Sequence, residues 1–157
     1  MLSKKNKNSR PEAHPGIAAV IINKKTKRIL LIKRRNLPII QNRGIWSFLF
    51  GGKEENETYL ETAYREIHEE ISFEKNDLKL IFKPVRTLIK DIRSGKRWYN
   101  HLFIFLTDRA DIKLSYENSS YRWALPDDIF NEINYKNVFS KREEIEALIK
   151  KTLKTLK

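Results

Sequence analysis

The sequence contains no cysteine among its 157 residues, which excludes a disulfide scaffold, a thiolate zinc site and a cysteine nucleophile. It also has no long hydrophobic run. The longest, Ile17–Ile22 and Leu102–Leu106, are far shorter than the ~20 residues that span a bilayer. Residues 1–16 are basic and lack the apolar core of a signal peptide. We therefore expect a cytoplasmic protein with no membrane partner.

Acidic residues are scarce: 20 Asp and Glu oppose 32 Lys and Arg, which gives a net charge of +12. A positive field concentrates anionic substrates around a protein, although a lysine-rich solubilising surface explains the same charge. The few acids are unevenly placed, because eight of the 20 lie between Glu54 and Glu74. This clustering in a basic chain requires a specific explanation.

The length predicts one domain with a core large enough to fold without a metal or disulfide. We expect a basic flexible tail over residues 1–14 and a single domain over 15–157. Apolar, β-branched runs at 16–23 and 28–35 predict a hairpin. Further strands are predicted over residues 44–50, 77–90, 97–108 and 112–114. Helices are predicted over residues 58–71, 126–133 and 140–155. The order of elements predicts an α/β fold, a mixed sheet flanked by helices.

The acidic segment reads as an amphipathic helix that begins at Thr58. Thr58 and Glu61 have the spacing of a capping box. Helical spacing then places the apolar residues in one stripe: Leu60, Ala63, Tyr64, Ile67 and Ile71. We expect this stripe to pack against the sheet.

Three glutamates, Glu66, Glu69 and Glu70, form a second stripe about 120° from the apolar one. One interpretation is a solvated acidic face. Against it, Glu66 and Glu70 form an i,i+4 like-charge pair that costs ~0.2–0.5 kcal/mol, and no lysine follows four residues after either. The other interpretation is a divalent cation site, because carboxylate oxygens at this spacing suit Mg²⁺. The spacing alone leaves both open.

The segment Gly51–Phe73 resembles the Nudix box, which is a Gly, five residues, a Glu, seven residues, then Arg-Glu-apolar-x-Glu-Glu-x-Gly-apolar. Eight of the nine defined positions match at fixed spacing. The exception is Ser72 in place of the final Gly, so we expect the helix to end without a left-handed glycine cap. The resemblance implies an α/β/α sandwich with a mixed, mostly antiparallel-paired sheet that carries the box as loop–helix–loop. It also implies hydrolysis of a diphosphate bond in a nucleoside diphosphate linked to another group.

The same resemblance implies roles for particular residues. Glu66, Glu69 and Glu70 are the expected catalytic metal ligands, with Mg²⁺ as the ion and Mn²⁺ as its substitute. The carbonyl of Gly51 is a further candidate ligand, although Phe50 stands where the family more often has Pro and the loop counted from Gly52 is one residue short. In this family the base often comes from a distant loop.

The remaining site residues are implied more weakly. Glu117, six residues before Trp123, is the candidate base or a further ligand. Glu57, Arg65 and Gly52 are expected to have structural roles in the box, with Arg65 paired to Glu57. Three arginines, one of them in the loop after the second strand, are candidates for binding substrate phosphates: Arg34, Arg35 and Arg43.

The substrate is the least defined part of the prediction. A small nucleotide is favoured, such as a dNTP, an ADP-sugar or a dinucleoside polyphosphate. The second candidate is a triphosphate RNA 5′ end, because Tyr121-Arg122-Trp123 and the segment Val138–Arg142 resemble bacterial RNA pyrophosphohydrolases. Two other possibilities are a catalytically silent Nudix-fold nucleotide-binding module and a basic RNA-binding domain with an incidental acidic helix. We expect a monomer or a homodimer.

Overall fold

The computed structural model describes residues 14–40, 44–90, 95–131 and 141–156. Its strands are β1 (His14–Asn23), β2 (Ile29–Arg34), β3 (Trp46–Ser47), β4 (Leu49–Gly52), β5 (Lys79–Leu80), β6 (Val85–Lys90), β7 (Arg97–Thr107) and β8 (Asn118–Ala124). Its helices are α1 (Tyr59–Ile71), the 3-10 turn η1 (Lys75–Asp77), α2 (Pro126–Phe130) and α4 (Arg142–Thr155). Among these described residues, no helix is long and apolar enough to cross a membrane.

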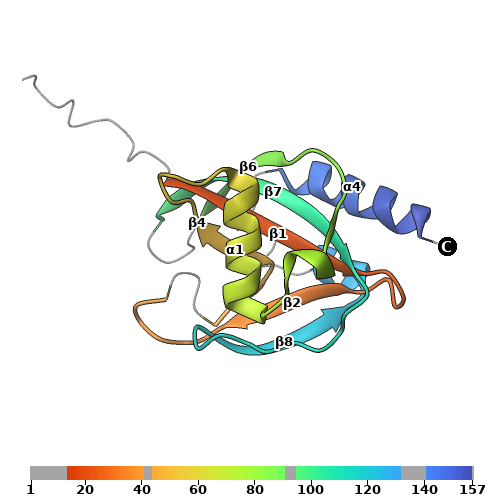
Figure 1. Ribbon diagram of the computed structural model, residues 1–157, viewed down its shortest axis with the longest axis horizontal. Coiled ribbons are helices and arrows are strands. Elements are labelled where there is room, and N and C mark those ends of the chain that lie inside the picture. Colours follow the sequence, from red (N-terminus) through yellow and green to blue (C-terminus); the bar gives the residue numbers. More distant parts are fainter. Residues whose placement is uncertain (1–13, 41–43, 91–94, 132–140, 157) are drawn as a thin grey trace, which may run out of the picture.

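The strands form one mixed sheet whose main path is β3-β2-β1-β7-β5 (Figure 1). The long central strands β1 and β7 are parallel, and every other pairing in the described residues is antiparallel. Three strands pair off this path: β4 with β1, β6 with β7 and β8 with β2. The predicted mixed, mostly antiparallel-paired sheet is confirmed.

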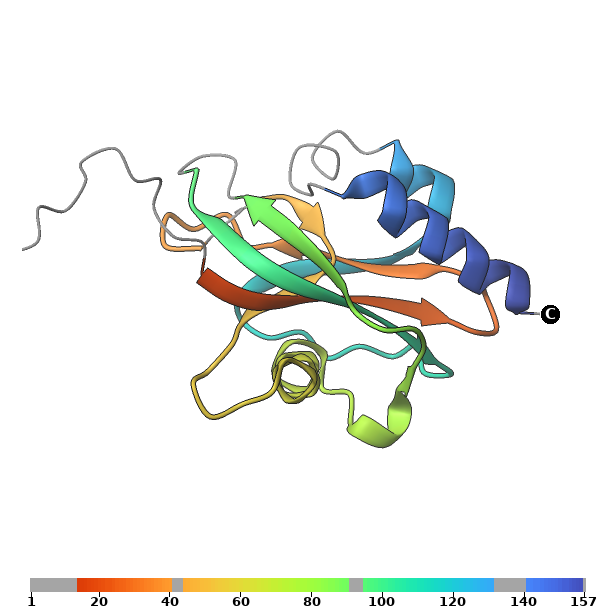
Figure 2. The same cartoon turned by 90° about the horizontal axis from the view of Figure 1, so that it is seen from above.

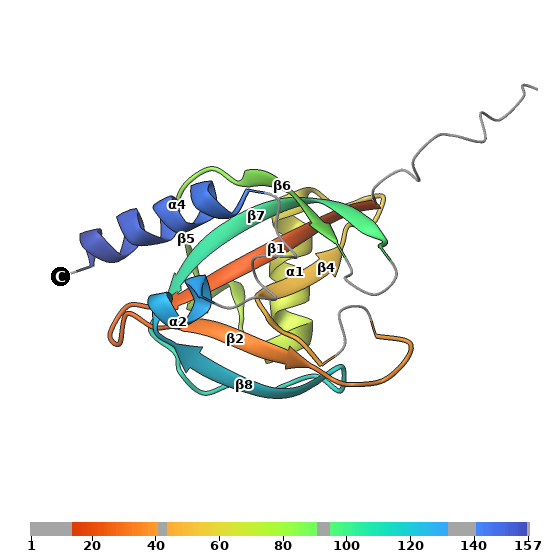
Figure 3. The same ribbon diagram turned by 180° about the vertical axis from the view of Figure 1, so that it is seen from behind.

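Helices cover both faces of the sheet, so the fold has three layers (Figure 2). In β1, Ile17 and its alternate neighbours face α1, whereas Ala18 and its alternate neighbours face α2 and α4. This alternation follows from the period of two in a strand. Because β1 is covered on both sides, it is apolar at nearly every position, as a central strand must be. Figure 3 shows α2 and α4 on the face opposite α1.

Several predicted boundaries differ from the structure. Residues 112–114, predicted as an edge strand, have irregular backbone. They lie alongside the C-terminal end of α1, where the Ser115 amide donates to the Glu70 carbonyl at 2.9 Å. The predicted strand 77–90 is divided into η1, β5 and β6. Phe82 adopts a φ of 64° and Pro84 has no backbone donor, so the ladder is interrupted there. The predicted strand 44–50 is divided at Phe48 into β3 and β4.

The C-terminal end of α1 is unusual. The helix ends at Ser72, which itself adopts the left-handed conformation with φ 63° and ψ 27°. The sequence predicted only that a glycine cap is lacking, and the structure retains the left-handed turn with a residue that has a Cβ. That conformation costs a non-glycine residue roughly 1–2 kcal/mol.

Candidate active site

Helix α1 begins as its sequence predicts. Thr58 is the N-cap, its hydroxyl accepts from the Glu61 amide at 3.1 Å, and the Glu61 carboxylate accepts from the Thr58 amide at 3.0 Å. Its apolar stripe packs on the sheet, with Ala63, Ile67 and Ile71 fully buried. The second stripe lies at the edge of this contact: the side chains of Glu66 and Glu70 are 13% and 6% exposed, and that of Glu69 is 55% exposed.

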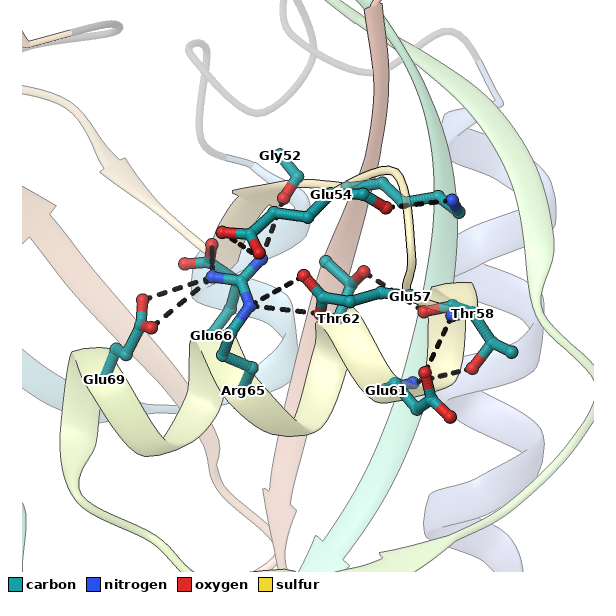
Figure 4. A network of polar contacts seen from close by, with 10 residues as sticks. Gly52, Glu54, Glu57, Thr58, Glu61, Thr62, Arg65, Glu66 and Glu69 are labelled. Carbon is teal, nitrogen blue, oxygen red and sulfur yellow. Dashed lines mark hydrogen bonds and ion pairs between the residues drawn. The ribbon is translucent and has the colours of Figure 1, made fainter.

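Arg65 links the helix to the loop before it (Figure 4). Its Nε donates to both oxygens of Glu57, at 2.9 and 3.0 Å, and its Nη2 donates to the Gly52 carbonyl at 3.0 Å. Its Nη1 lies 2.9 Å from Glu66 Oε1 and 3.3 Å from Glu69 Oε2. The hydrogen bond from Arg65 holds the pKa of Glu57 below its ordinary value. The ion pair that the resemblance implied between Arg65 and Glu57 is therefore present.

Gly51 provides the space into which Glu66 folds. A Cβ built on Gly51 would lie 2.0 Å from Glu66 Cγ and 2.2 Å from its Cδ. The glycine is thus required sterically, because any side chain here displaces the Glu66 carboxylate. Burial raises the pKa of Glu66 to about 7, even though Arg65 acts in the opposite direction.

Glu70 is held by residues distant in the sequence. Its Oε2 accepts from Asn118 Nδ2 and, at 3.2 Å, from Ser115 Oγ, and its Oε1 lies 4.0 Å from Arg34 Nη1. The same Arg34 nitrogen lies 3.9 Å from Glu117 Oε2. Burial raises the pKa of Glu70 above its ordinary value. The turn before β8 therefore connects α1 to β2 around one carboxylate.

Several of these groups line one pocket of about 570 Å³. Among the residues that the sequence singled out, it contains Glu66, Glu69, Glu70, Glu117, Gly51, Gly52 and Arg34. The tertiary structure thus brings the box, the end of β2 and the turn before β8 to one place. A pocket that combines carboxylates with an arginine can bind both a cation and phosphate oxygens.

Arg35 is not brought into this pocket. Its Nε donates to the Tyr116 carbonyl at 2.6 Å, and its guanidinium lies 4.8 Å from the Tyr116 ring centroid. It therefore braces the turn that carries Glu117. Arg43, the third predicted arginine, lies outside the described residues.

Sequence reasoning missed several residues of the pocket. Asn100 lines it from β7, and Ser115, Tyr116 and Phe50 complete its wall, whereas Trp98, also in the lining, stands out in the sequence as an aromatic residue beside Lys96 and Arg97. Asn118, which holds Glu70, is 2% exposed and was not singled out either. A polar residue at the start of a strand gives no local signal of such a contact, since its partner lies 48 residues away.

The sequence profile of the NUDIX domain matches residues 12–148. An RNA pyrophosphohydrolase of Pelagibacter ubique is 28% identical over 149 residues, which cover 83% of this chain and 91% of that protein. The RNA pyrophosphohydrolase of Legionella pneumophila (strain Corby) is 28% identical over 135 residues, covering 70% and 74%.

Solved structures show the same fold. The Escherichia coli dihydroneopterin triphosphate pyrophosphohydrolase superposes with a TM-score of 0.66 at 23% identity, covering 88% of this chain and 98% of its own. A Caenorhabditis elegans Ap4A hydrolase superposes with a TM-score of 0.65 at 19% identity, covering 90% and 97%. The chain belongs to the Nudix family. It is a hydrolase of the class that cleaves pyrophosphate bonds.

Proposed function

We propose that this hydrolase removes pyrophosphate from the 5′ end of triphosphate RNA, using a divalent cation, Mg²⁺ or Mn²⁺, at the carboxylates of Glu66, Glu69 and Glu70. The observation that carries the proposal is the pocket itself, which gathers these carboxylates and Arg34 in a chain with a net charge of +12. The proposal includes a cytoplasmic location, where the enzyme would meet its RNA substrate.

The donor set suits such a cation, because Mg²⁺ prefers carboxylate and carbonyl oxygens. In the described part of the chain, however, no three acidic or histidine side chains converge as a metal site. Arg65 holds Glu66 and Glu69, while Asn118 and Ser115 hold Glu70. The proposal therefore requires Glu66 and Glu69 to leave Arg65 when a cation binds. Bound there, the cation would polarise the phosphorus and neutralise charge on the leaving phosphate.

The chain's own residues have distinct tasks in this proposal. Arg34, at 12% exposure, donates to the phosphate oxygens from the floor of the pocket. Glu117 is 58% exposed at the pocket mouth, so it can accept the proton of the attacking water. Water adds to phosphorus, the P–O–P bond breaks, and the products are 5′-monophosphate RNA and pyrophosphate. Arg65 positions the loop and does not touch substrate.

The choice of RNA rests on two supports. Both relatives described above are RNA pyrophosphohydrolases, and a positive field attracts a polyanion more strongly than a single nucleotide. The sequence by itself favoured a small nucleotide. That substrate remains the second candidate, because a pocket of about 570 Å³ is within the range that encloses a small ligand.

The test measures product release from 5′-triphosphate RNA, dNTPs, ADP-ribose and dinucleoside polyphosphates, each with Mg²⁺ and with Mn²⁺. The variants are Glu69→Gln and the matched control Glu55→Gln, which changes an exposed acid outside the pocket lining. We expect metal-dependent pyrophosphate release from RNA that is lost in Glu69→Gln and kept in Glu55→Gln. Release from a small nucleotide alone would refute the RNA assignment, and full activity of folded Glu69→Gln would refute the metal assignment.

A further inference from the structure

A second hollow lies along strand β6 and has a different chemistry from the active-site pocket. This β6–β7 groove, of about 600 Å³, is lined by Tyr59, Tyr99, Arg86 and Lys141, with Pro15 and Leu88 as apolar walls. Tyr99 is 55% exposed, and Arg86 and Lys141 are exposed as well. None of the described lining residues is acidic.

The β6–β7 groove adjoins the active-site pocket. Tyr99 of the groove lies between Trp98 and Asn100, which both line the pocket. Successive side chains of a strand point to opposite faces of the sheet, so Tyr99 lies on one face while Trp98 and Asn100 lie on the other. The groove and the pocket are therefore next to each other around the N-terminal end of β7. On the adjacent strand β1, Pro15 of the groove pairs with Tyr99, and Gly16 pairs with Asn100 of the pocket. A flexible chain leaving the pocket reaches the groove by passing this strand end.

Two further lysines lie beside aromatic rings of the pocket and of the groove. Lys96 Nζ lies 5.3 Å from the centroid of the Trp98 ring, and Lys53 Nζ lies 5.6 Å from the centroid of the Tyr59 ring. Aromatic rings beside cations bind single-stranded nucleic acid, because rings stack with bases of any sequence while cations contact the phosphates. The groove has this composition, whereas the pocket is rich in carboxylates.

We propose that the β6–β7 groove binds the nucleotides that follow the 5′ end of a single-stranded RNA, while the triphosphate occupies the active-site pocket. This inference rests on the proposed function, because it names how the rest of that substrate is held. Tyr99 stacks with a base, and Arg86 and Lys141 contact the phosphodiester backbone. The groove makes the enzyme prefer RNA over a free nucleotide that has the same terminal phosphates.

Binding is measured first, without metal, by fluorescence anisotropy of a 12-nucleotide single-stranded RNA with a 5′-hydroxyl end. Tyr99→Ala combined with Arg86→Ala should weaken binding about tenfold, and Arg86→Ala alone should reduce the slope of log K against log salt by about 0.7. Matched controls are Phe82→Ala between β5 and β6 and Lys25→Ala in the turn after β1, both exposed and outside the groove. Equal losses in the controls, or displacement of the RNA by equimolar polyglutamate, would overturn the inference.

Activity then separates this inference from the proposed function. In the wild type, KM for 5′-triphosphate RNA should fall at least about fivefold between a dinucleotide and a 12-mer, with kcat unchanged. The double variant should lose that length dependence and keep its activity on the dinucleotide. Hydrolysis of RNA with no length dependence refutes the groove and leaves the proposed function standing. Failure of the wild type to hydrolyse any triphosphate RNA refutes the proposed function, and the metal-free binding then decides the groove by itself.

Discussion

The two ends of the active-site pocket are held in different ways. At one end, Arg65 connects Glu66 and Glu69 to the loop residues Glu57 and Gly52, all within 18 residues of one another. At the other end, Glu70 is held by Asn118, Ser115 and Arg34, which come from other parts of the chain. The first end is a local structure of the box, and the second depends on the sheet and the turn before β8.

This difference predicts how substitutions act. A change at the Arg65 end disturbs a local network and should affect activity with a modest effect on the fold. A change at the Glu70 end should affect activity and the packing of the turn before β8 together.

The largest effect is expected from Gly51→Ala. The new methyl group cannot coexist with Glu66 Cγ at 2.0 Å, so Glu66 must rotate away from its place in the pocket. We expect kcat/KM to fall by about 100-fold, since a misplacement of about 1 Å can cost that much. The free energy of unfolding should fall by less than about 1 kcal/mol, as measured by urea denaturation, because the atoms that must move belong to the flexible Glu66 side chain.

Gly52→Ala is the matched control for this substitution. A Cβ on Gly52 meets no atom within 4 Å, and Gly52 is not among the positive-φ glycines of the described residues. Its carbonyl, which accepts from Arg65, is unchanged by the substitution. Equal losses of activity in the two variants would show that the steric relation between Gly51 and Glu66 is irrelevant.

At the Glu70 end, Asn118→Ala should lower kcat/KM by about tenfold. Partners that orient ligand carboxylates typically contribute 10–100-fold. The variant should also lose about 1–3 kcal/mol of unfolding free energy, because the largely buried Glu70 carboxylate loses a donor. Ser119→Ala, at an exposed position next in the chain, is the control. An unchanged unfolding midpoint in Asn118→Ala would show that the contact between Asn118 and Glu70 does not stabilise the fold.

Ser72→Gly should stabilise the protein by about 1 kcal/mol. Ser72 has a φ of 63°, and glycine adopts this conformation without the steric cost of a Cβ. Thermal unfolding measures the gain, and kcat should stay within twofold because Ser72 is not among the described residues that line the pocket. Ser120→Gly in β8 provides the control, where a strand glycine should be destabilising instead. A loss of stability in Ser72→Gly would refute the assigned strain.

The smallest effect on stability is expected from Asp77, which lies in η1 and is not among the described residues that line the pocket. A hydrogen bond from the Glu74 amide and the nearby Arg109 guanidinium hold the pKa of Asp77 below its ordinary value. A depressed carboxyl pKa contributes stability that is present above the unfolded value and is lost as pH falls through the folded value. Urea denaturation between pH 7 and about pH 3 should therefore show a shallower acid loss in Asp77→Asn than in wild type. If the unfolding free energies of the two proteins fall in parallel with pH, Asp77 does not contribute to the loss of stability in acid.

What the sequence by itself determined is local in origin. The box spacing, the capping box of Thr58 and the apolar stripe of α1 all depend on residues that lie between Gly51 and Phe73. Their physical basis is helix periodicity and short-range hydrogen bonding, so they can be read from the chain. The mixed sheet also followed from the order of the predicted strands and helices, and the apolar run at 16–23 suits a central strand.

The tertiary structure alone decided the other half of the site. Arg34 is the last residue of β2 and Arg35 follows it, yet only Arg34 reaches Glu70, because Arg34 pairs with Asn118 of β8 whereas Arg35 binds the Tyr116 carbonyl. Likewise, residues 112–114 are apolar enough for a strand, but they lie alongside the C-terminal end of α1. Asn118 meets Glu70 only because β2 pairs with β8 and α1 packs on the same sheet. Contacts between distant segments depend on register and packing, which no local pattern of residues records.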